Sequence, residues 1–387
     1  MTPSRPATYT VLSAFLIAAC RAAAQLPGIT AIEESPTPAV RTSPALPSFP
    51  TRTGLSPTPT VEIPIPVDVP VISPSNVSDL VPVWQFASED RLYRVEWSPR
   101  ENWLGIGGLG EGWGVQVRGF PDLEIDMLIQ DGPDDFAFSP DEASLFVGSE
   151  GGVSVWDLSL STLKAEYRDP YDWTSTATMA LSPDGATVAS SVGPPLARGV
   201  FLILHIWDVA TGAERLAIVE DGVGLSYQLA FRPDGREIAS GSRLSGRVNF
   251  WDARTGERRG QVKGEGVAYS PDGEFIATAN ANSVWIWDAA TKALIRELSV
   301  GGEAGEDLPL AFSPDGAMLA AGKDDLTIWS TDDWTELATW SAPAGTFHSL
   351  RFSPSGKYLG SVSGQTTPAE AGGWIYEYVA TVWAVDD

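Results

Sequence analysis

The chain has 387 residues and a formal net charge of −25, because 50 acidic side chains outnumber 25 basic ones. Such an acidic protein repels nucleic acids and anionic lipid headgroups, so nucleic acid is excluded as the expected partner. With one cysteine and two histidines, the sequence also excludes a disulfide framework and a cysteine-based zinc cluster, and it offers little imidazole for acid–base catalysis.

An apolar stretch near the start predicts export. Residues 8–19, TYTVLSAFLIAA, follow the basic residue Arg5 and are too short to span a bilayer comfortably, which is typical of a secretion signal. The stretch ends in LIAAC at Cys20, the only cysteine, and this resembles the bacterial lipoprotein lipobox. The resemblance implies that residues 1–19 are a signal peptide and that Cys20 carries a lipid after cleavage. The alternative is cleavage after Ala24, which would give a secreted protein.

Residues 20–81 are expected to form a lipidated, disordered linker. Thirteen of the 30 prolines lie between Gln25 and Pro82, in strings such as SPTPTVEIPIPVDVPVISP at 56–74. Such a composition favours extended polyproline II structure and cannot bury a core. We expect a stalk that holds the following domain away from a membrane, and a ligand for a proline-binding module is the alternative.

The remaining chain repeats one phrase seven times. Ser-Pro-Asp-Gly or a variant of it, as in AFSPDGAMLA at 311–320, recurs at steps of 38 to 50 residues. Each copy has the residues of a tight turn between apolar flanks, which predicts a β-hairpin. A second pattern follows 16 to 25 residues after the turn serine in most copies, for example VSVWD at 153–157, and predicts another strand. Thr-Gly follows in two copies, at 211–212 and 255–256, and leads to a further short strand such as ERRGQVKG at 257–264. Each unit therefore contains four short strands.

These units resemble the WD-repeat family. The resemblance implies an all-β fold, a seven-bladed β-propeller of four-stranded blades, over residues 82–387. The chain departs from the family in two ways, since no histidine occupies the position of the buried polar relay and Arg118 replaces the expected tryptophan of the first unit. We therefore expect apolar packing and turns to hold the blades together.

Counting strands predicts how the ring closes. The chain ends at ATVWAVDD, residues 380–387, which is the third strand of the seventh blade. The segment PVWQFASED, residues 82–90, precedes the first hairpin and has the pattern of an outer strand. It is expected to pair with the last blade and cover both edges.

Candidate catalytic and metal-binding residues are few. One aspartate per turn is expected to be structural, and these residues are Asp141, Asp184, Asp234, Asp272 and Asp315. The acidic stretch DGPDD at 131–135 lacks the alternating spacing of a calcium loop. His205 lies in an apolar strand and is expected to pack there. The sequence therefore predicts no catalytic residue, no metal site and no cofactor.

Aromatic residues in loops of unusual length are candidates for partner binding. Exposed aromatic side chains are typical anchors at protein interfaces. The resemblance implies that blade connections and long second-to-third strand loops, such as 192–203, share one face. The alternative is that these rings pack within their own loops. The candidates are Tyr171, Trp173, Tyr227, Trp374, Tyr376 and Tyr378.

The sequence predicts a non-enzymatic, monomeric binding module outside a bacterial cell, anchored to the membrane only through Cys20. It would present one propeller face to a protein or peptide partner. The alternative is an extracytoplasmic hydrolase or lyase that uses carboxylates or a bound calcium on that face.

Overall fold

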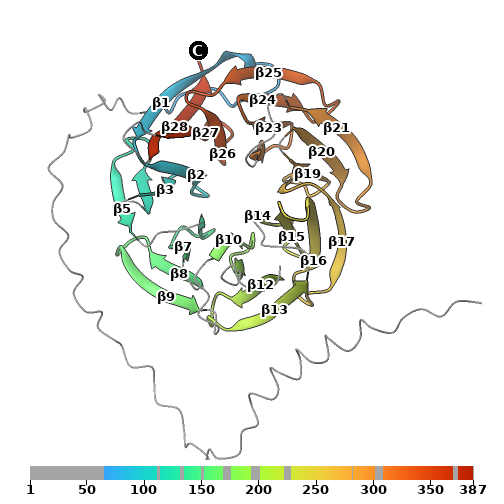
Figure 1. Ribbon diagram of the computed structural model, residues 1–387. Coiled ribbons are helices and arrows are strands. Elements are labelled where there is room, and N and C mark those ends of the chain that lie inside the picture. The colour runs from blue at the N-terminus through green and yellow to red at the C-terminus, as the bar shows by residue number, and fades with distance from the viewer. Residues whose placement is uncertain are drawn as a thin grey trace, which may run out of the picture. The chain divides into compact units, whose positions relative to one another are not determined.

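The computed structural model describes residues 65–110, 114–130, 135–149, 152–168, 176–192, 201–221, 228–280, 282–300, 308–368 and 374–386. All of them belong to one unit of the chain, Thr60–Asp387. Seven four-stranded sheets surround a central axis as the blades of a propeller (Figure 1). The prediction of an all-β, seven-bladed propeller is confirmed.

Blades 1 to 6 each contain four consecutive strands, ordered from the axis outward. Blade 1 contains β2 (Arg91–Trp97), β3 (Trp103–Leu109), β4 (Val115–Gly119) and β5 (Ile125–Ile129). Blade 2 contains β6 (Asp135–Phe138), β7 (Ser144–Ser149), β8 (Gly152–Asp157) and β9 (Thr162–Arg168). Blade 3 contains β10 (Thr176–Leu181), β11 (Thr187–Val192), β12 (Phe201–Asp208) and β13 (Glu214–Asp221).

The next three blades repeat this arrangement. Blade 4 contains β14 (Gln228–Phe231), β15 (Glu237–Ser242), β16 (Arg247–Asp252) and β17 (Arg258–Lys263). Blade 5 contains β18 (Gly266–Tyr269), β19 (Phe275–Ala279), β20 (Ser283–Asp288) and β21 (Leu294–Ser299). Blade 6 contains β22 (Leu310–Phe312), β23 (Met318–Gly322), β24 (Asp325–Ser330) and β25 (Glu336–Ser341).

Blade 7 is assembled from two distant parts of the chain. It contains β26 (Thr346–Phe352), β27 (Leu359–Pro368), β28 (Trp374–Val385) and, as its outer strand, β1 (Leu80–Ser88). The β1–β28 ladder is antiparallel and runs from the pair Leu80–Val385 to the pair Ser88–Tyr378. The predicted closing strand is therefore confirmed, with bounds shifted slightly toward the N-terminus.

The repeated turns explain the repeated phrase. In blade 6 the Ser313 hydroxyl donates to Asp315 Oδ1 over 2.6 Å, and the Ala317 N–H donates to the same oxygen over 3.0 Å. Gly316 has a φ of 73°, which a glycine adopts without strain. The turns of blades 2, 3 and 5 repeat the serine–aspartate bond at the same 2.6 Å. These aspartates are structural, as predicted.

Antiparallel pairing gives the ring two distinct faces. The Ser-Pro-Asp-Gly turns and the third-to-fourth strand turns lie on one face, which we call the turn face. The second-to-third strand connections and the blade-to-blade connections lie on the opposite face, which we call the loop face. Seven clusters of buried apolar side chains, one at each junction between neighbouring blades, form the core between them.

Tryptophan hydrogen bonds supplement the apolar packing and the turns, which corrects in part the expectation that the buried polar relay is absent. In four blades an indole Nε1 donates to a hydroxyl on the adjacent second strand. The pairs are Trp207–Ser190 at 3.0 Å, Trp251–Ser240 at 2.9 Å, Trp287–Thr278 at 2.8 Å and Trp383–Ser361 at 2.9 Å. This part of the family's polar relay is therefore present without a histidine, and each bond adds about 0.5–1.5 kcal/mol.

Arg118, which replaces the expected tryptophan of blade 1, is buried and connects blade 1 to β1. Its side chain is 3% exposed, and Nη1 donates to the Leu123 carbonyl over 2.8 Å. The guanidinium lies 4.6 Å from the ring centroid of Phe86 and 5.6 Å from that of Trp84. Both rings belong to β1, so a cation–π contact ties the closing strand to blade 1.

The propeller begins earlier than the predicted boundary between residues 81 and 82. Residues 65–79, which we call the strap, bury Ile65, Ile72 and Val77 to 2% exposure or less. The Ile72 N–H donates to the Gly356 carbonyl over 2.9 Å, and the Tyr358 hydroxyl donates to the Pro66 carbonyl over 2.7 Å. A short 3₁₀ helix, η1 (Val77–Asp79), then leads into β1. The strap lies on the turn face, and the end of the predicted linker is folded.

Removal of β1 should destabilise the whole ring. A chain that begins at Glu89 leaves β28 with an unpaired edge, so we expect a melting temperature roughly 10 °C below that of a chain that begins at Ile65, together with aggregation. Circular dichroism and light scattering measure both effects. A third chain that begins at Leu80 retains β1 without the strap and separates the two contributions. Equal melting temperatures for all three chains would contradict the closure.

Candidate binding site

The aromatic residues predicted for blade 3 lie outside the described part of the chain. Tyr171, Trp173 and Tyr227 are in segments that the structure does not describe. The described residues at their borders do show how the blade is oriented. Thr176, where β10 begins, is the register partner of Val192, where β11 ends. β10 therefore begins and β11 ends on the loop face, which is the face expected for the blade connections and for the loop 192–203.

The loop face of blade 7 carries an extended hairpin. β27 and β28 have 10 and 12 residues, whereas the second and third strands of the other blades have 5 to 8. Pairing with β26 stops at Gly364, and pairing with β1 stops at Tyr378. Residues 365–368 and 374–377 therefore continue as a two-stranded ribbon beyond the four-stranded blade. We call these eight residues the ribbon tip.

The three predicted aromatics of blade 7 differ in exposure according to their distance from the ring. Trp374 is 63% exposed and is the only aromatic among the strongly exposed large apolar side chains of the described part. Tyr376 is half-buried and packs against the core cluster between blades 7 and 1. Tyr378 is only 3% exposed, so its ring belongs to the core and offers no surface to a partner. Its ring centroid lies 5.3 Å from that of His348.

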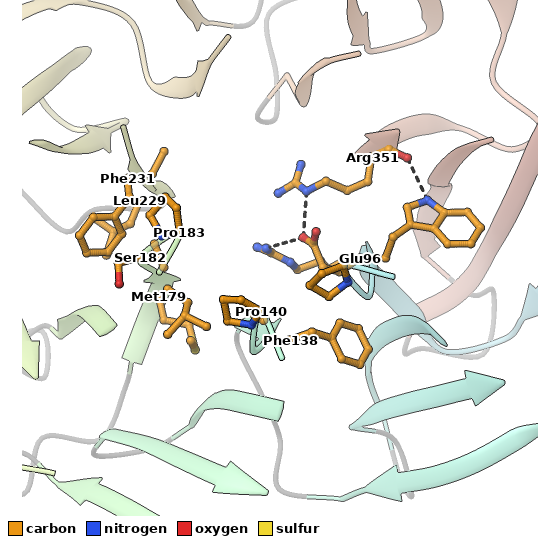
Figure 2. A pocket seen from close by; sticks show the side chains of 16 residues that line it. Glu96, Phe138, Pro140, Met179, Ser182, Pro183, Leu229, Phe231 and Arg351 are labelled. Carbon is orange, nitrogen blue, oxygen red and sulfur yellow. Dashed lines mark hydrogen bonds and ion pairs between the residues drawn. The ribbon is translucent and has the colours of Figure 1, made fainter. Parts of the chain in front are cut away.

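A second candidate region is a cavity of about 520 Å³ in the central channel. Figure 2 shows Glu96 and Arg351 on one side of it and Leu229 and Phe231 on the opposite side. Its walls come from the inner strands β2, β6, β10, β14 and β26 and from prolines of the turns. Most of the lining residues are apolar, and the charged ones lie at the junction between blades 7 and 1.

Those charged groups form a chain of contacts across four blades, which we call the inner polar chain. Glu96 Oε2 accepts hydrogen bonds from Arg351 Nε of blade 7 and from Arg94 Nη2, each over 2.9 Å. Arg94 also forms an ion pair with Asp135 of blade 2. Asp135 Oδ2 in turn accepts from the Thr178 hydroxyl of blade 3 over 2.8 Å. The contacts thus connect blades 7, 1, 2 and 3 at the axis.

The two arginines keep Glu96 ionised. Burial by itself raises the pKa of the Glu96 carboxyl, but the charges of Arg351 and Arg94 and their hydrogen bonds outweigh burial and lower it. Burial likewise disfavours the charged form of Arg94, and the neighbouring Asp135 and Glu96 raise the pKa of this guanidinium above its usual value. Such a carboxylate is suited to an ion pair and not to a general acid, which requires a pKa near the working pH.

Sequence reasoning did not find the inner polar chain. It grouped Asp135 with the acidic stretch at 131–135, whereas the structure assigns its carboxylate to Arg94, Thr178 and the Met179 N–H. His205 is 1% exposed, stacks on Trp207 and contacts Glu214 at 2.9 Å, as expected for a packed strand residue. In the described ranges, no three His, Cys, Asp or Glu side chains are grouped so that they could hold a metal ion. The same ranges contain no helix with the length and apolarity needed to cross a membrane.

Comparison with known proteins agrees with this geometry. Residues 260–288, which include most of blade 5, match the family model of the WD domain, G-beta repeat. The chain is a seven-bladed β-propeller with a WD40 repeat in blade 5. WD40 propellers typically act as protein-interaction scaffolds and are generally non-catalytic.

Curated relatives of this propeller are similar over part of their length. WD repeat-containing protein SL1-17 of Schistosoma mansoni is 31% identical over 186 residues, which is 46% of this chain and 58% of that protein. Protein LST8 homolog of Drosophila melanogaster is 30% identical over 35% of this chain and 48% of its own length. Small ribosomal subunit protein RACK1 of Caenorhabditis elegans is 28% identical over 41% and 49%, respectively. The chain thus spans about half the length of these relatives.

Acid should weaken the ring through Glu96. Because the folded-state pKa of Glu96 is lowered, its contribution to stability is present above the unfolded-state pKa, near 4.5, and is lost as the pH falls through the folded-state value. We expect Glu96→Gln to lower the free energy of unfolding by about 1–3 kcal/mol at pH 7. Denaturant unfolding should show this difference shrinking toward pH 3.

The matched control is Glu274→Gln, which removes an exposed carboxylate from a turn of blade 5. This variant should follow the wild type at every pH. A Glu96→Gln difference that stays constant with pH would show that the ion pairs do not provide the stability.

Proposed function

We propose that this propeller is a non-catalytic scaffold that binds a protein or peptide partner on its loop face, outside the cell, while a lipid on Cys20 tethers it to the membrane. The observation that carries the binding role is Trp374, which is 63% exposed on a ribbon tip that continues beyond the blade. A tryptophan held by two paired strands loses little conformational entropy on binding, which suits an anchor residue.

The position of the strap favours the loop face over the turn face. The strap contacts the turn of blade 7 at Gly356 and reaches blade 1, where the Ile65 N–H donates to the Pro121 carbonyl over 3.2 Å. The strap therefore covers part of the turn face. The ribbon tip lies on the opposite face, which the strap leaves open to a partner.

The channel carboxylates argue against the alternative of a hydrolase or lyase. Glu96 is neutralised by two guanidinium groups, and Asp135 is held by an arginine, a hydroxyl and a backbone N–H. Carboxylates with these partners orient and stabilise the blades. The lowered pKa of Glu96 makes this carboxyl a poor proton donor, which supports the scaffold.

Position-specific crosslinking tests the binding role. A photoreactive amino acid at Ile375 of the full chain, in the cells that produce it, is expected to form a discrete adduct with one partner. Trp374→Ala should reduce that adduct strongly, because truncation of a hot-spot aromatic typically costs about 2 kcal/mol or more in binding. The control position is Val219, an apolar residue on β13 that is 57% exposed. Similar adducts at both positions would contradict the proposal.

The tether is tested separately. Cys20 lies outside the described residues, and its lipidation is expected from the lipobox resemblance. Cys20→Ala should move the protein from the membrane fraction to the soluble fraction and abolish labelling by an alkyne fatty acid. A wild-type N-terminus at Gln25, measured by mass spectrometry, would favour the secreted form and overturn the anchor.

A further inference from the structure

We propose that the outer edge of the ribbon tip, Trp374–Glu377, receives an extended segment of the partner protein as an additional β-strand. This inference rests on the proposed function and states how the loop face recognises its partner. It joins three observations: an edge that the blade leaves unpaired, apolar side chains on that edge, and a negative charge at its base.

The edge continues an interface that the chain already uses. β1 pairs with the outer edge of β28 from Val385 as far as Tyr378, and the chain then turns toward β2 at Arg91. In the described part of the protein, no strand pairs with residues 374–377 on this side. An extended chain placed end to end with β1 would therefore continue the same ladder along the edge. An unpaired strand edge is a template for such strand addition.

The inner edge of the ribbon tip, at residues 365–368, is less suited to this role. The connection before β26 lies against its base, because a Cβ atom at Gly345 would collide with the Gly364 carbonyl oxygen and crowd the Gln365 side chain. Its other end is Pro368, which has no N–H to donate to a ladder. The outer edge is therefore the available one.

Three of the four residues of the outer edge are uncharged, and the one charge, Glu377, lies at its base. Outer strand β17 carries Arg258, Arg259 and Lys263, and charged residues on edges discourage pairing with other chains. By contrast, Trp374 is 63% exposed, Ile375 is 48% exposed, and Tyr376 between Ile375 and Glu377 is also uncharged. An incoming strand with apolar side chains in alternation would cover them.

The charge at the base of the edge indicates the polarity of the incoming segment. Glu377 is exposed and accepts a hydrogen bond from Gln365 Nε2 over 2.6 Å, and Glu89, also exposed, follows β1. A basic residue at the end of the partner segment beside Ser88 would complement both carboxylates. A second copy of this chain would instead bring together two molecules with a net charge of −25 each, which disfavours self-pairing.

Selected peptides with modified backbones test strand addition directly. A random heptapeptide display library is selected on the immobilised full chain, and the enriched peptides are synthesised unmodified and with N-methyl groups at alternate residues, in both registers. We expect alternating apolar residues with a basic residue at one end. One methylated register should lose affinity about ten-fold or more, because its N–H groups no longer reach the edge, while the other register keeps it.

Protein variants locate the binding. Ile375→Lys places a charge on the edge and should lower the affinity for the enriched peptides to a similar extent. Val219→Lys, at an equally exposed strand position of blade 3, should leave their affinity unchanged. Thermal unfolding should show that both variants remain folded, because both side chains are exposed.

The other outcomes separate this inference from the proposed function. If Trp374→Ala lowers the affinity for the peptides but the peptides methylated in either register bind normally, the loop-face site stands and strand addition is wrong. If neither Trp374→Ala nor Ile375→Lys affects binding, or if no peptide is enriched, strand addition is overturned, and the crosslinking at Ile375 judges the proposed function alone. A concentration-dependent dimer that Ile375→Lys abolishes in sedimentation would identify a second copy as the occupant and overturn the inference.

Discussion

The junction between blades 7 and 1 is the constraint on which the rest of the propeller depends. At every junction the outer strand of one blade leads into the inner strand of the next, and here β1 leads into β2. Within blade 7, however, β1 and the strands β26–β28 come from distant parts of the chain and must be held together by noncovalent contacts. Three contacts act at increasing distance from the axis. The ion pair between Glu96 and Arg351 lies at the channel, a core cluster lies behind it, and the β1–β28 ladder lies outside. Separating β26–β28 from β1 and blade 1 would break all three, so closure resists both hinging and sliding of the blades.

The inner polar chain is best understood as a means of fixing how the blades meet. Charges removed from water gain little net stability from pairing, because desolvation offsets most of the attraction. Removing one partner is costly, however, since it leaves the other charge without compensation. Blades 7, 1, 2 and 3 are therefore held in one arrangement. Between the inner strands of blades 4 and 5 the contact is neutral, because Gln228 Oε1 accepts from the Val267 N–H over 2.8 Å. The ion pair of these two blades, Lys292–Glu237, lies at β15 and the turn after β20 instead. The charged part of the channel thus coincides with the closing junction.

The repeat made most of the fold predictable from the sequence. The features that were not predicted, the strap and the inner polar chain, depart from the repeat. Seven turn motifs predict seven hairpins, and the strand count predicts the closing strand. The folded strap was not predicted, because Ile65, Ile72 and Val77 lie in a proline-rich stretch whose composition is typical of disorder. The inner polar chain was not predicted, because its members occupy equivalent positions of the repeat with different side chains. Arg94, Asp135 and Thr178 lie four residues before the turn serine, and Glu96 and Arg351 lie two residues before it.

The aromatics of blade 7 show the same limit on a smaller scale. Residues 374, 376 and 378 alternate along one strand, so sequence treats them alike. Their exposure depends on which other side chains lie against each position. Tyr378 lies within the four-stranded part of the blade and packs against His348 and Gly364, whereas Trp374 lies beyond the end of β1 and β26. The spacing along β28 does not reveal these contacts.

Stability and recognition are consequently located on different parts of the molecule. The closing ladder, the strap and the core clusters all lie within the four-stranded part of the blades or on the turn face. The ribbon tip buries little apolar surface, so its side chains contribute little to the free energy of folding. Lengthening a loop or hairpin also adds little to the entropy of closing it. Substitutions at Trp374 and Ile375 therefore leave the ring intact, and the affinity for a partner can change there independently of the fold.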